Sequence, residues 1–484
     1  MLHLVFLSPH SDPQATLGEP DSGGQCVYQH QLALALTQYP DLQVTTFCRQ
    51  TYQRPAISQL NDRYRIVRLE IGDKEYVPKE IMERHIPEFA QKVHAYLKKN
   101  FPQEGAILHA HYWDGGRTAL ELKHLDSGRY GLIWTPHSLG ALKRRKFVGE
   151  HMEAMYNFIP RVCWENYTAL TARKVIVSST IEKNDLMELY AVPARKIEVI
   201  APGVDFSHLK MADRLTARRQ LQLPESGNIL LCLGRQVPSK GYHHAIKALR
   251  VVKEKLEEPV YLVIAGGSEQ PSTPVEIQYR RQLTNLIKEL NVQDNVVFFP
   301  AAPHDQVHYL FNAADIFLMP SEHEPFGIVT IESMAVRRPV VAANAGGPAE
   351  IITHNQTGCL VDFDQPVQAA KYILSLLKDS RFTQRIVNNA YHYVRQEYSW
   401  PARAEEFAHI YRQVAQGRRS NLFAHWTHNN YFLQQAFTPS PSSSPRHSQQ
   451  NTKERKVCVS SKLPHWRNPF PQPSMVAPSW LSTT

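Results

Sequence analysis

The segment DIFLMPSEHEPFGIVTIESMA, residues 315–335, joins an apolar run to a helical pattern through a short loop. Pro325 and Gly327 interrupt any continuous helix, so we expect a strand to end before the loop and a helix to begin after it. Glu324 then lies in the loop, and Glu332 lies one or two turns into the helix. A short apolar strand that leads into a helix is the building unit of a parallel sheet.

The same unit recurs along the chain. Strand-like runs cover residues 2–8, 42–48, 106–111, 131–137, 174–179 and 196–203 in the first half, and 228–235, 260–267, 295–300, 315–321 and 338–347 in the second. Apolar strands that alternate with helices predict parallel sheets covered on both faces. Because the series breaks near residues 203–225, we predict an α/β protein with two facing, doubly wound, Rossmann-like domains and a ligand cleft between them.

These patterns set the expected domain boundaries. The N-terminal domain is predicted over residues 1–205 and the second domain over residues 206–398. Residues 399–418 are predicted to form a last helix that crosses back to the N-terminal domain. Residues 419–484 are rich in Pro and Ser and lack periodicity, which predicts a largely disordered tail.

The composition is that of an ordinary globular protein. The chain has 484 residues, 43% of them hydrophobic and 20% charged, and no apolar run is long enough to span a membrane. The start, MLHLVFLSPHSDP, does not resemble a signal peptide. The six cysteines are scattered without a CxxC pair, which favours reduced thiols and a cytoplasmic location.

The net charge of +9 does not predict a nucleic-acid partner. From Arg419 onward the chain carries seven basic residues and one acid, so the tail holds +6 and residues 1–418 hold only +3. A nearly neutral body with a basic tail is not typical of an enzyme that acts on nucleic acid.

Charged side chains follow two strands of the second predicted sheet. Arg235 and Lys240 lie in the loop GRQVPSKG, and two separate cations suit a diphosphate, although a solvated basic turn is the alternative. The loop is not a P-loop, because it lacks the GKS or GKT ending. We expect Glu324 to bind sugar hydroxyls and Glu332 to bind ribose. An acid that only stabilises a helix start is the alternative for Glu332.

Backbone N–H groups complete the predicted donor site. Those of Phe326 and Gly327 precede a helix, where an anion or a sugar oxygen is readily bound. The first domain offers EPDSGGQCVYQHQLALAL, residues 19–36, in which Gly24 allows close approach of a phosphate to the backbone. This segment lacks the GxGxxG pattern of dinucleotide-binding proteins, and a plain helix start is its alternative.

Together the E-x7-E pattern, the R-x4-K loop and the N-terminal GGQ resemble the GT-B retaining glycosyltransferases of family 4 type, in the group of sucrose-phosphate synthase and sucrose synthase. The resemblance covers residues 1 to about 416 and is nearest to the sucrose-phosphate synthases. It implies that Arg235 and Lys240 bind the donor diphosphate, that Glu332 binds ribose and that Glu324 contacts the transferred glucose.

The acceptor is expected against the first domain. HAHYWDGG (109–116) and TPHSLGALKRRKF (135–147) both follow strands, and the resemblance places the histidine of HSLG, His137, near the reaction centre. Lys79, Lys143 and Arg161 could converge on a phosphate, although they could also be unrelated surface cations. The predicted acceptor residues are Gln25, Lys79, Tyr112, Asp114, Ser138, Lys143 and Arg161. HYWDGG departs from the plant-type HYADA pattern and is closer to transferases that use inositol phosphate.

The sequence therefore predicts transfer of glucose from UDP-glucose or ADP-glucose to fructose 6-phosphate, with retention. His137, Glu324, Arg235 and Lys240 are the predicted catalytic residues. Free fructose or inositol phosphate as acceptor, a GT-B epimerase and a non-catalytic sugar-nucleotide sensor are the alternatives. A PLP-dependent phosphorylase and an oxidoreductase are disfavoured because their motifs are missing. No aspartate cluster demands a metal, so we predict that none is required, with Mg2+ as an optional activator.

Overall fold

The structure is a computed structural model that describes residues 1–15, 23–51, 54–72, 77, 81–146, 157–267, 274–302, 306–322 and 324–417. The predicted tail, residues 419–484, lies outside these ranges. Within them, every helix is too short or too polar to span a bilayer.

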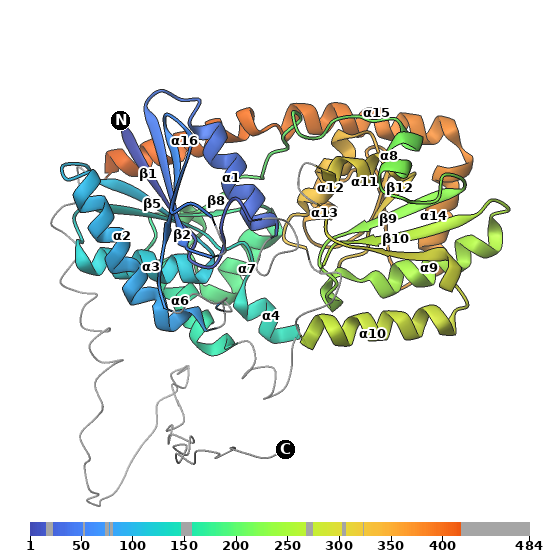
Figure 1. The fold of residues 1–484 in the computed structure, drawn as a ribbon, viewed down its shortest axis with the longest axis horizontal. Coiled ribbons are helices and arrows are strands. Elements are labelled where there is room, and N and C mark those ends of the chain that lie inside the picture. Colours follow the sequence, from blue (N-terminus) through green and yellow to red (C-terminus); the bar gives the residue numbers. More distant parts are fainter. Residues whose placement is uncertain are drawn as a thin grey trace, which may run out of the picture. The chain divides into compact units, whose positions relative to one another are not determined.

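Eight of the described strands form the first sheet, in the order β3-β4-β2-β1-β5-β6-β7-β8 (Figure 1). The strands are β1 Leu2–Leu7, β2 Leu42–Arg49, β3 Ile57–Asn61, β4 Tyr64–Leu69, β5 Ala106–His111, β6 Tyr130–Thr135, β7 Lys174–Val177 and β8 Ile197–Val199. All neighbours are parallel except β3, which pairs antiparallel with β4. The β3–β4 hairpin was not predicted, because its outer strand alternates in burial and carries no continuous apolar run.

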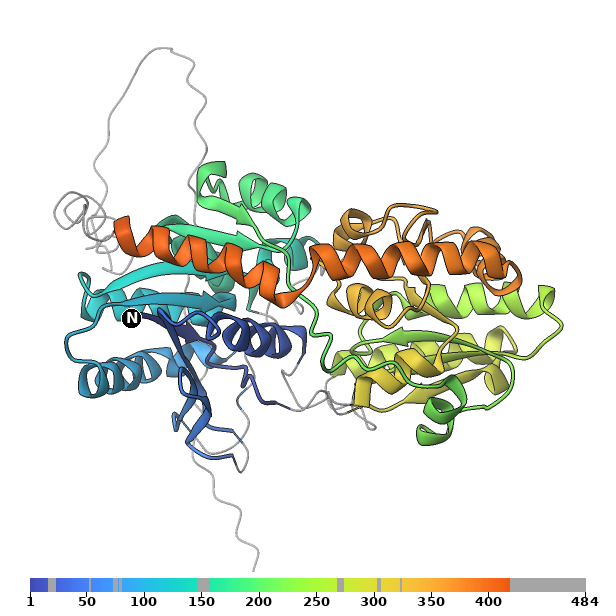
Figure 2. The ribbon, with the colours of Figure 1, turned by 90° about the horizontal axis from the view of Figure 1, so that it is seen from above.

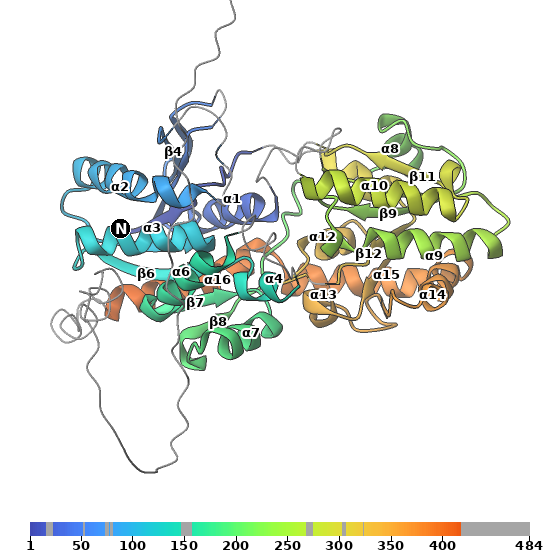
Figure 3. The same ribbon diagram turned by 90° about the horizontal axis from the view of Figure 1, so that it is seen from below.

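Helices cover both faces of the first sheet, and two apolar clusters fill the space beneath them. Phe89 of α2, Leu122 of α3 and Ala169 of α6 belong to one cluster, whereas Leu32 of α1 belongs to the other. Figure 3 looks onto the face that α2, α3 and α6 cover. The bounds are α1 Gly24–Leu36, η1 Met82–His85, α2 Ile86–Asn100, α3 Tyr112–Leu125, α4 Gly140–Lys146, α6 Phe158–Thr171, α7 Thr180–Tyr190 and η2 Ala194–Lys196.

The second sheet has the order β11-β10-β9-β12-β13-β14 among the described strands, and all its pairs are parallel. The strands are β9 Asn228–Leu233, β10 Val260–Ala265, β11 Val296–Phe299, β12 Ile316–Met319, β13 Val340–Ala343 and β14 Cys359–Val361. The first five were predicted, and each prediction ran past one or both observed ends of the strand by one to four residues per end. β14 was missed, because three residues are too few for a pattern to be visible.

The second sheet is also covered on both faces. Apolar side chains of α9, α10 and α14 form one cluster, and those of α8, α11, α12 and α15 form the other. The bounds are α8 Arg214–Gln220, η3 Pro238–Lys240, α9 Tyr242–Lys255, α10 Pro274–Glu289, η4 Gln293–Asn295, α11 Val307–Ala313, α12 Ile328–Ala335, α13 Gly346–Ile351, α14 Pro366–Lys378 and α15 Ser380–Glu397. Two parallel-sheet α/β domains are therefore present, as predicted.

The last described helix, α16 (Trp400–Gly417), returns to the first sheet. Phe407 and Tyr411 of α16 share an apolar cluster with Leu32 of α1, while α15 packs against α12 beside the second sheet. Figure 2 shows α15 and α16 in orange, one after the other along the two sheets. Residues near both domain junctions meet where Val204 pairs with Ser399.

The strand order fixes where ligands can bind. In the second sheet, β9 lies between β10 and β12, so the chain first adds strands on one side of β9 and then on the other. In the first sheet, β1 lies between β2 and β5 in the same way. A crevice opens at the carboxyl ends of the strands at such a switch point. The loops after β9, β12, β1 and β5 are therefore the loops from which a binding site can be built, and most of the predicted motifs adjoin them; the HSLG motif follows the neighbouring strand β6.

Among the described cysteines, Cys48, Cys232 and Cys359 are buried and free, and Cys26 is buried with its Sγ 2.9 Å from Oγ of Ser11. This agrees with the prediction of reduced thiols. Cys163, on α6, is free but exposed.

Candidate active site

Lys240 and Glu324 meet at the switch point of the second sheet. Lys240 ends η3 after β9, Glu324 lies in the loop after β12, and their Nζ and Oε2 atoms are 2.5 Å apart. Arg235 lies in the same loop as Lys240 and is exposed, and its guanidinium has no hydrogen bond or ion pair with another described residue. One predicted cation is thus paired with a predicted sugar ligand, and the other is available for an anion.

A glycine holds the two loops together. Gly241 has a φ of +66°, and a Cβ atom there would lie 2.0 Å from the carbonyl oxygen of Pro320, at the end of β12. No side chain fits in that space, and the left-handed conformation is open to glycine at little cost. The close approach keeps the Lys240 loop against the Glu324 loop.

The loop after β13 supports Glu324 from the other side. The N–H of Gly347 donates to the carbonyl oxygen of Glu324 at 2.8 Å, and a Cβ on Gly347 would lie 2.2 Å from the Cα of Phe326. The sequence pattern predicts this segment only as the end of a strand. The paired glycines Gly346 and Gly347, directly after a strand, were the signal that could have identified it.

Two helix N-termini, one from each sheet, lie close together. Gly327, with a φ of +91°, precedes α12, and a Cβ on Gly24, the first residue of α1, would lie 3.7 Å from the Cδ1 atom of Ile328. The first N–H groups of a helix lack partners within the helix and carry partial positive charge. Convergence of two such ends favours an anionic or polyhydroxyl ligand.

Glu332 lies on the second turn of α12. Burial raises the pKa of its carboxyl group to about 7, because little water reaches the charged form. The residue is half-buried, and its carboxyl group makes no hydrogen bond or ion pair with another described residue. The carboxylate is therefore free to accept hydrogen bonds from a ligand.

On the first sheet, two predicted residues have strained backbones. Tyr112 follows β5 with a φ of +67°, and His137 follows β6 with a φ of +56°. Residues other than glycine seldom adopt a positive φ, and those that do concentrate at functional sites. Trp134 Nε1 donates to the carbonyl oxygen of Tyr112 at 2.9 Å, which helps to hold that conformation.

The half-buried His137 ends a row of histidines, of which His109 and His111 are buried. Its Nε2 lies 2.9 Å from Nδ1 of His111, and His109 contacts the ring of His111 at a centroid distance of 4.1 Å. Burial lowers the pKa of His137 to about 3, so the imidazole is neutral at neutral pH. Nε2 of His111 is buried and has no hydrogen-bond partner in the described part of the chain.

Asp114 and Gln25 have partners within the protein. Asp114 is fully buried, and its Oδ2 lies 2.6 Å from Nδ1 of His10. Gln25 Nε2 donates to Oγ of Ser8 at 3.2 Å, in the loop after β1. Both predicted acceptor residues therefore shape the edge of the first sheet, and only Gln25 is partly exposed.

Arg161, on α6, has all three guanidinium nitrogens engaged. Nε donates to Glu165 at 2.7 Å, Nη1 to the hydroxyl of Tyr112 at 2.8 Å, and Nη2 to the carbonyl oxygen of Ser138 at 2.8 Å. Only 6% of the residue is exposed. In this structure Arg161 therefore holds two other predicted acceptor residues in place. Direct phosphate binding by Arg161 stays a prediction.

The remaining predicted cations are only partly described. Lys143 is half-buried on α4, one turn after Ser138. Lys79 lies outside the described residues. The three cations expected to converge on a phosphate are thus not all visible as a group; of the two described, Arg161 is buried and Lys143 is half-buried.

A small pocket is lined by residues from the loops and helices of both sheets. Ser138, Leu142 and Glu182 line it from the first sheet's elements, and Glu324, Pro325 and Gly346 line it from the second's. Nearby, both carboxylate oxygens of Glu350 on α13 accept from the backbone N–H groups of Thr180 and Ile181, at 2.8 and 2.7 Å, which caps α7. Predicted acceptor and donor residues thus face one space.

Comparison with known proteins agrees with this arrangement. A family described as glycosyl transferases group 1 matches residues 213–393, and glycosyltransferase family 4 matches residues 22–208. The chain is 28% identical over 420 residues to mannosylfructose-phosphate synthase of Agrobacterium fabrum, covering 83% of this chain and 89% of that one. It is 30% identical over 424 residues to D-inositol 3-phosphate glycosyltransferase of Corynebacterium urealyticum, covering 85% and 96%.

A solved structure extends the match to three dimensions. Sucrose-phosphate synthase from Thermosynechococcus elongatus superposes with a TM-score of 0.75 at 28% identity, covering 86% of this chain and 100% of that chain.

Proposed function

The chain belongs to the group 1 and family 4 glycosyltransferases, and on that premise we propose that it transfers glucose from UDP-glucose or ADP-glucose to fructose 6-phosphate. The product would be sucrose 6-phosphate, with retained configuration at the anomeric carbon. The observation that carries the proposal is the pocket that Ser138 and Glu324 both line, because one comes from the acceptor motif and the other from the donor motif.

The donor would lie over the switch point of the second sheet. Arg235 and Lys240 would neutralise the diphosphate, assisted by the N-termini of α1 and α12. Glu332 would accept the ribose hydroxyls. Glu324 would exchange part of its contact with Lys240 for a glucose hydroxyl, and the 2.5 Å distance between them shows that both groups can reach the same point.

The transfer itself would need no protein nucleophile. The bond from the anomeric carbon to the diphosphate breaks, and the acceptor oxygen bonds to the same face of that carbon. The hydroxyl proton passes to an oxygen of the departing diphosphate, whose growing charge Arg235 and Lys240 stabilise. Holding the two substrates next to one another between the two edges supplies the remaining advantage through positioning.

His137 suits a position next to the transferred sugar. Because burial keeps its imidazole neutral, it can exchange a hydrogen bond with a glucose hydroxyl without adding positive charge near a developing carbocation. The strained backbone at His137 and its contact with His111 would fix the ring before the substrate arrives.

A phosphorylated acceptor is favoured over a free sugar. The names of the three relatives all contain a phosphorylated polyol or sugar: mannosylfructose-phosphate, D-inositol 3-phosphate and sucrose-phosphate. Lys143 would contact the acceptor phosphate, and Arg161 would hold Tyr112 and Ser138 around it. Inositol phosphate is the second candidate, because HYWDGG and the inositol-phosphate relatives point the same way.

The test is a matrix of initial rates with the purified chain. UDP-glucose, ADP-glucose, GDP-glucose and GDP-mannose are each combined with fructose 6-phosphate, fructose and inositol 3-phosphate, and products are identified by mass. We expect turnover only with a glucose donor and fructose 6-phosphate. Turnover that prefers free fructose or inositol 3-phosphate would replace the proposed acceptor, and a preference for GDP-mannose would replace the donor.

One variant tests which substrate Lys143 contacts. Lys143→Ala should raise the KM for fructose 6-phosphate much more than the KM for the donor. Equal changes in both constants would remove Lys143 from the acceptor phosphate.

A further inference from the structure

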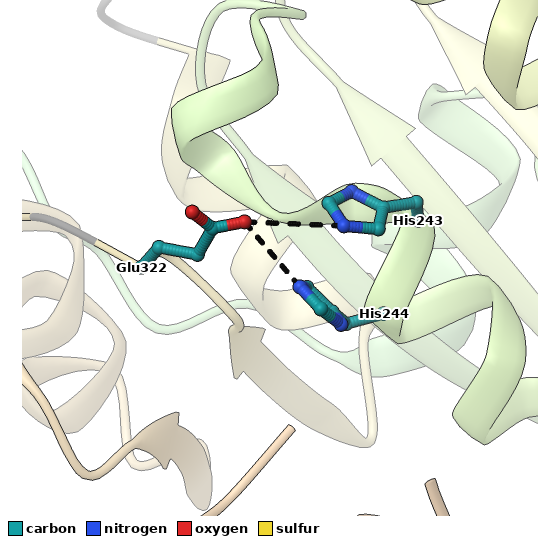
Figure 4. A group of neighbouring side chains, drawn as sticks. All are labelled: His243, His244 and Glu322. Atoms are coloured by element: carbon teal, nitrogen blue, oxygen red, sulfur yellow. Dashed lines mark hydrogen bonds and ion pairs between the residues drawn. The ribbon is translucent and has the colours of Figure 1, made fainter. Parts of the chain in front are cut away.

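Three potential metal ligands lie together beside the proposed donor site. His243 and His244 are in the first turn of α9, and Glu322 lies in the loop after β12 (Figure 4). One ligand atom of each residue lies within 4.8 Å of the other two. Oε1 of Glu322 is 3.4 Å from Nε2 of His244 and 3.9 Å from Nε2 of His243. Nothing in the proposed transfer reaction uses this group.

The spacing is close to that of a four-coordinate metal site. Metal–nitrogen and metal–oxygen bonds of roughly 2.0–2.1 Å at tetrahedral angles place neighbouring ligand atoms about 3.3 Å apart. The distance from His244 to Glu322 already matches, and the longer one needs only a small movement of Glu322. That side chain is 48% exposed, so it is free to make this movement.

One of the other ring nitrogens is supported as in metal sites. Nδ1 of His243 lies 3.0 Å from the hydroxyl of Tyr279, whereas Nδ1 of His244 lies 3.3 Å from Oδ1 of the exposed Asp364 without a hydrogen bond. A histidine that binds a metal through one ring nitrogen usually directs the other at a hydroxyl, carbonyl or carboxylate oxygen, which fixes the tautomer. The Nε2 atoms of both rings lie toward Glu322, and the Tyr279 contact assigns Nε2 as the ligating atom of His243.

From this geometry we propose that His243, His244 and Glu322 bind one divalent transition-metal ion, best matched by Zn2+. Two imidazoles and one carboxylate are the donor set of known three-ligand zinc sites, whereas Mg2+ prefers oxygen ligands and retains its water. The ion would join two loops, because His243 follows Lys240 by three residues and Glu322 precedes Glu324 by two. It therefore supports the two loops from outside the pocket.

The first experiment counts zinc ions on the full chain, freed of metal by a chelator. Zn2+ is titrated against a chromophoric competitor for the wild type and for His243→Asn/His244→Asn. The control, His208→Asn/His392→Asn, removes the same number of exposed or half-exposed imidazoles elsewhere, so histidines outside the site contribute equally. We expect the site variant to bind one equivalent less than both others. Equal stoichiometry in the site and control variants would overturn the proposal.

Milder substitutions keep the test meaningful if the double variant folds poorly. Glu322→Gln should weaken zinc binding at least tenfold, and Tyr279→Phe, which removes only the supporting hydroxyl beside His243, should weaken it on the order of 10–100-fold. Circular dichroism of the metal-free variants checks the fold. Unchanged zinc affinity in both, or displacement of Zn2+ by millimolar Mg2+, would contradict an imidazole-containing site.

Discussion

The two edges of the proposed pocket are built in opposite ways. At the edge of the first sheet, Tyr112 and Arg161 are buried, His137 is half-buried, and all three are bonded to other protein groups. At the edge of the second sheet, Lys240 is paired with Glu324, but the guanidinium of Arg235 is exposed and the carboxyl group of Glu332 has no partner among the described residues. The first edge is completed by the protein itself, whereas the second leaves two of its charges for a ligand.

The two edges therefore suit different parts of the proposed reaction. Fixed dipoles and neutral groups suit a reaction centre, because they need not rearrange when the substrate binds. Uncompensated charges suit a diphosphate donor, whose own charge replaces the missing partner. Substitutions at the first edge should therefore act mainly on stability, and those at the second mainly on donor use.

The largest effect is expected at Arg161. Arg161→Ala leaves Glu165 as a buried charge without its partner, which should lower the free energy of unfolding by about 3–5 kcal/mol. Arg145→Ala is the matched control, because it breaks an arginine–glutamate pair that is exposed on both sides and is worth about 0–1 kcal/mol. Urea unfolding measures both. Similar losses would show that the first edge is not held by this pair.

Lys240→Ala should come next, as a change in catalysis. Loss of one cation at the departing diphosphate should lower kcat on the order of 10²–10³-fold, with the fold retained. Lys247→Ala, on the exposed face of α9, is the control and should leave kcat unchanged. Initial rates at saturating acceptor measure the effect. A loss of less than threefold would mean that the second edge does not carry the diphosphate.

Glu332 should make donor binding depend on pH. Its folded-state pKa of about 7 lies above its ordinary value of 4.5, so folding favours the protonated form and stability falls as pH rises through this window. Ribose hydroxyls favour the carboxylate instead. Donor affinity measured by calorimetry should therefore rise about tenfold from about pH 6 to about pH 8. Glu332→Gln should bind more weakly and lose this slope; a variant that keeps the slope would exclude Glu332 as its source.

The smallest effect is expected where the two edges are tied together. Glu350→Gln weakens the carboxylate cap on α7 and should cost about 0.3–1 kcal/mol of unfolding free energy, less at high salt. Glu257→Gln changes an exposed glutamate away from this contact and should cost nothing measurable. If the two variants have equal stability, the Glu350 contact does not stabilise the folded chain.

Sequence patterns predicted what depends on short stretches of chain. Strands such as β12, IFLM, are buried on both faces and show as continuous apolar runs, so the parallel sheets and their order of appearance could be predicted. The hairpin of β3 and β4 lacked such a run and was missed. The two loops that carry the predicted donor charges could be located because proline and glycine mark each of them, as Pro325 and Gly327 do around Glu324.

The group of His243, His244 and Glu322 shows what a sequence pattern does not contain. Glu322 follows His244 by 78 residues, and the three come together only because β9 and β12 are neighbours in the sheet. The role of Arg161 has the same origin, since its partners Tyr112 and Ser138 follow two different strands.

The sequence by itself thus determined the α/β class, the two sheets and the loops that carry the donor charges, because those features follow from local periodicity and turn chemistry. Only the tertiary structure decided which charges are satisfied within the protein and which remain for a ligand. The physical reason is that burial and hydrogen bonding depend on neighbours brought together by strand order, and no short stretch of chain contains those neighbours.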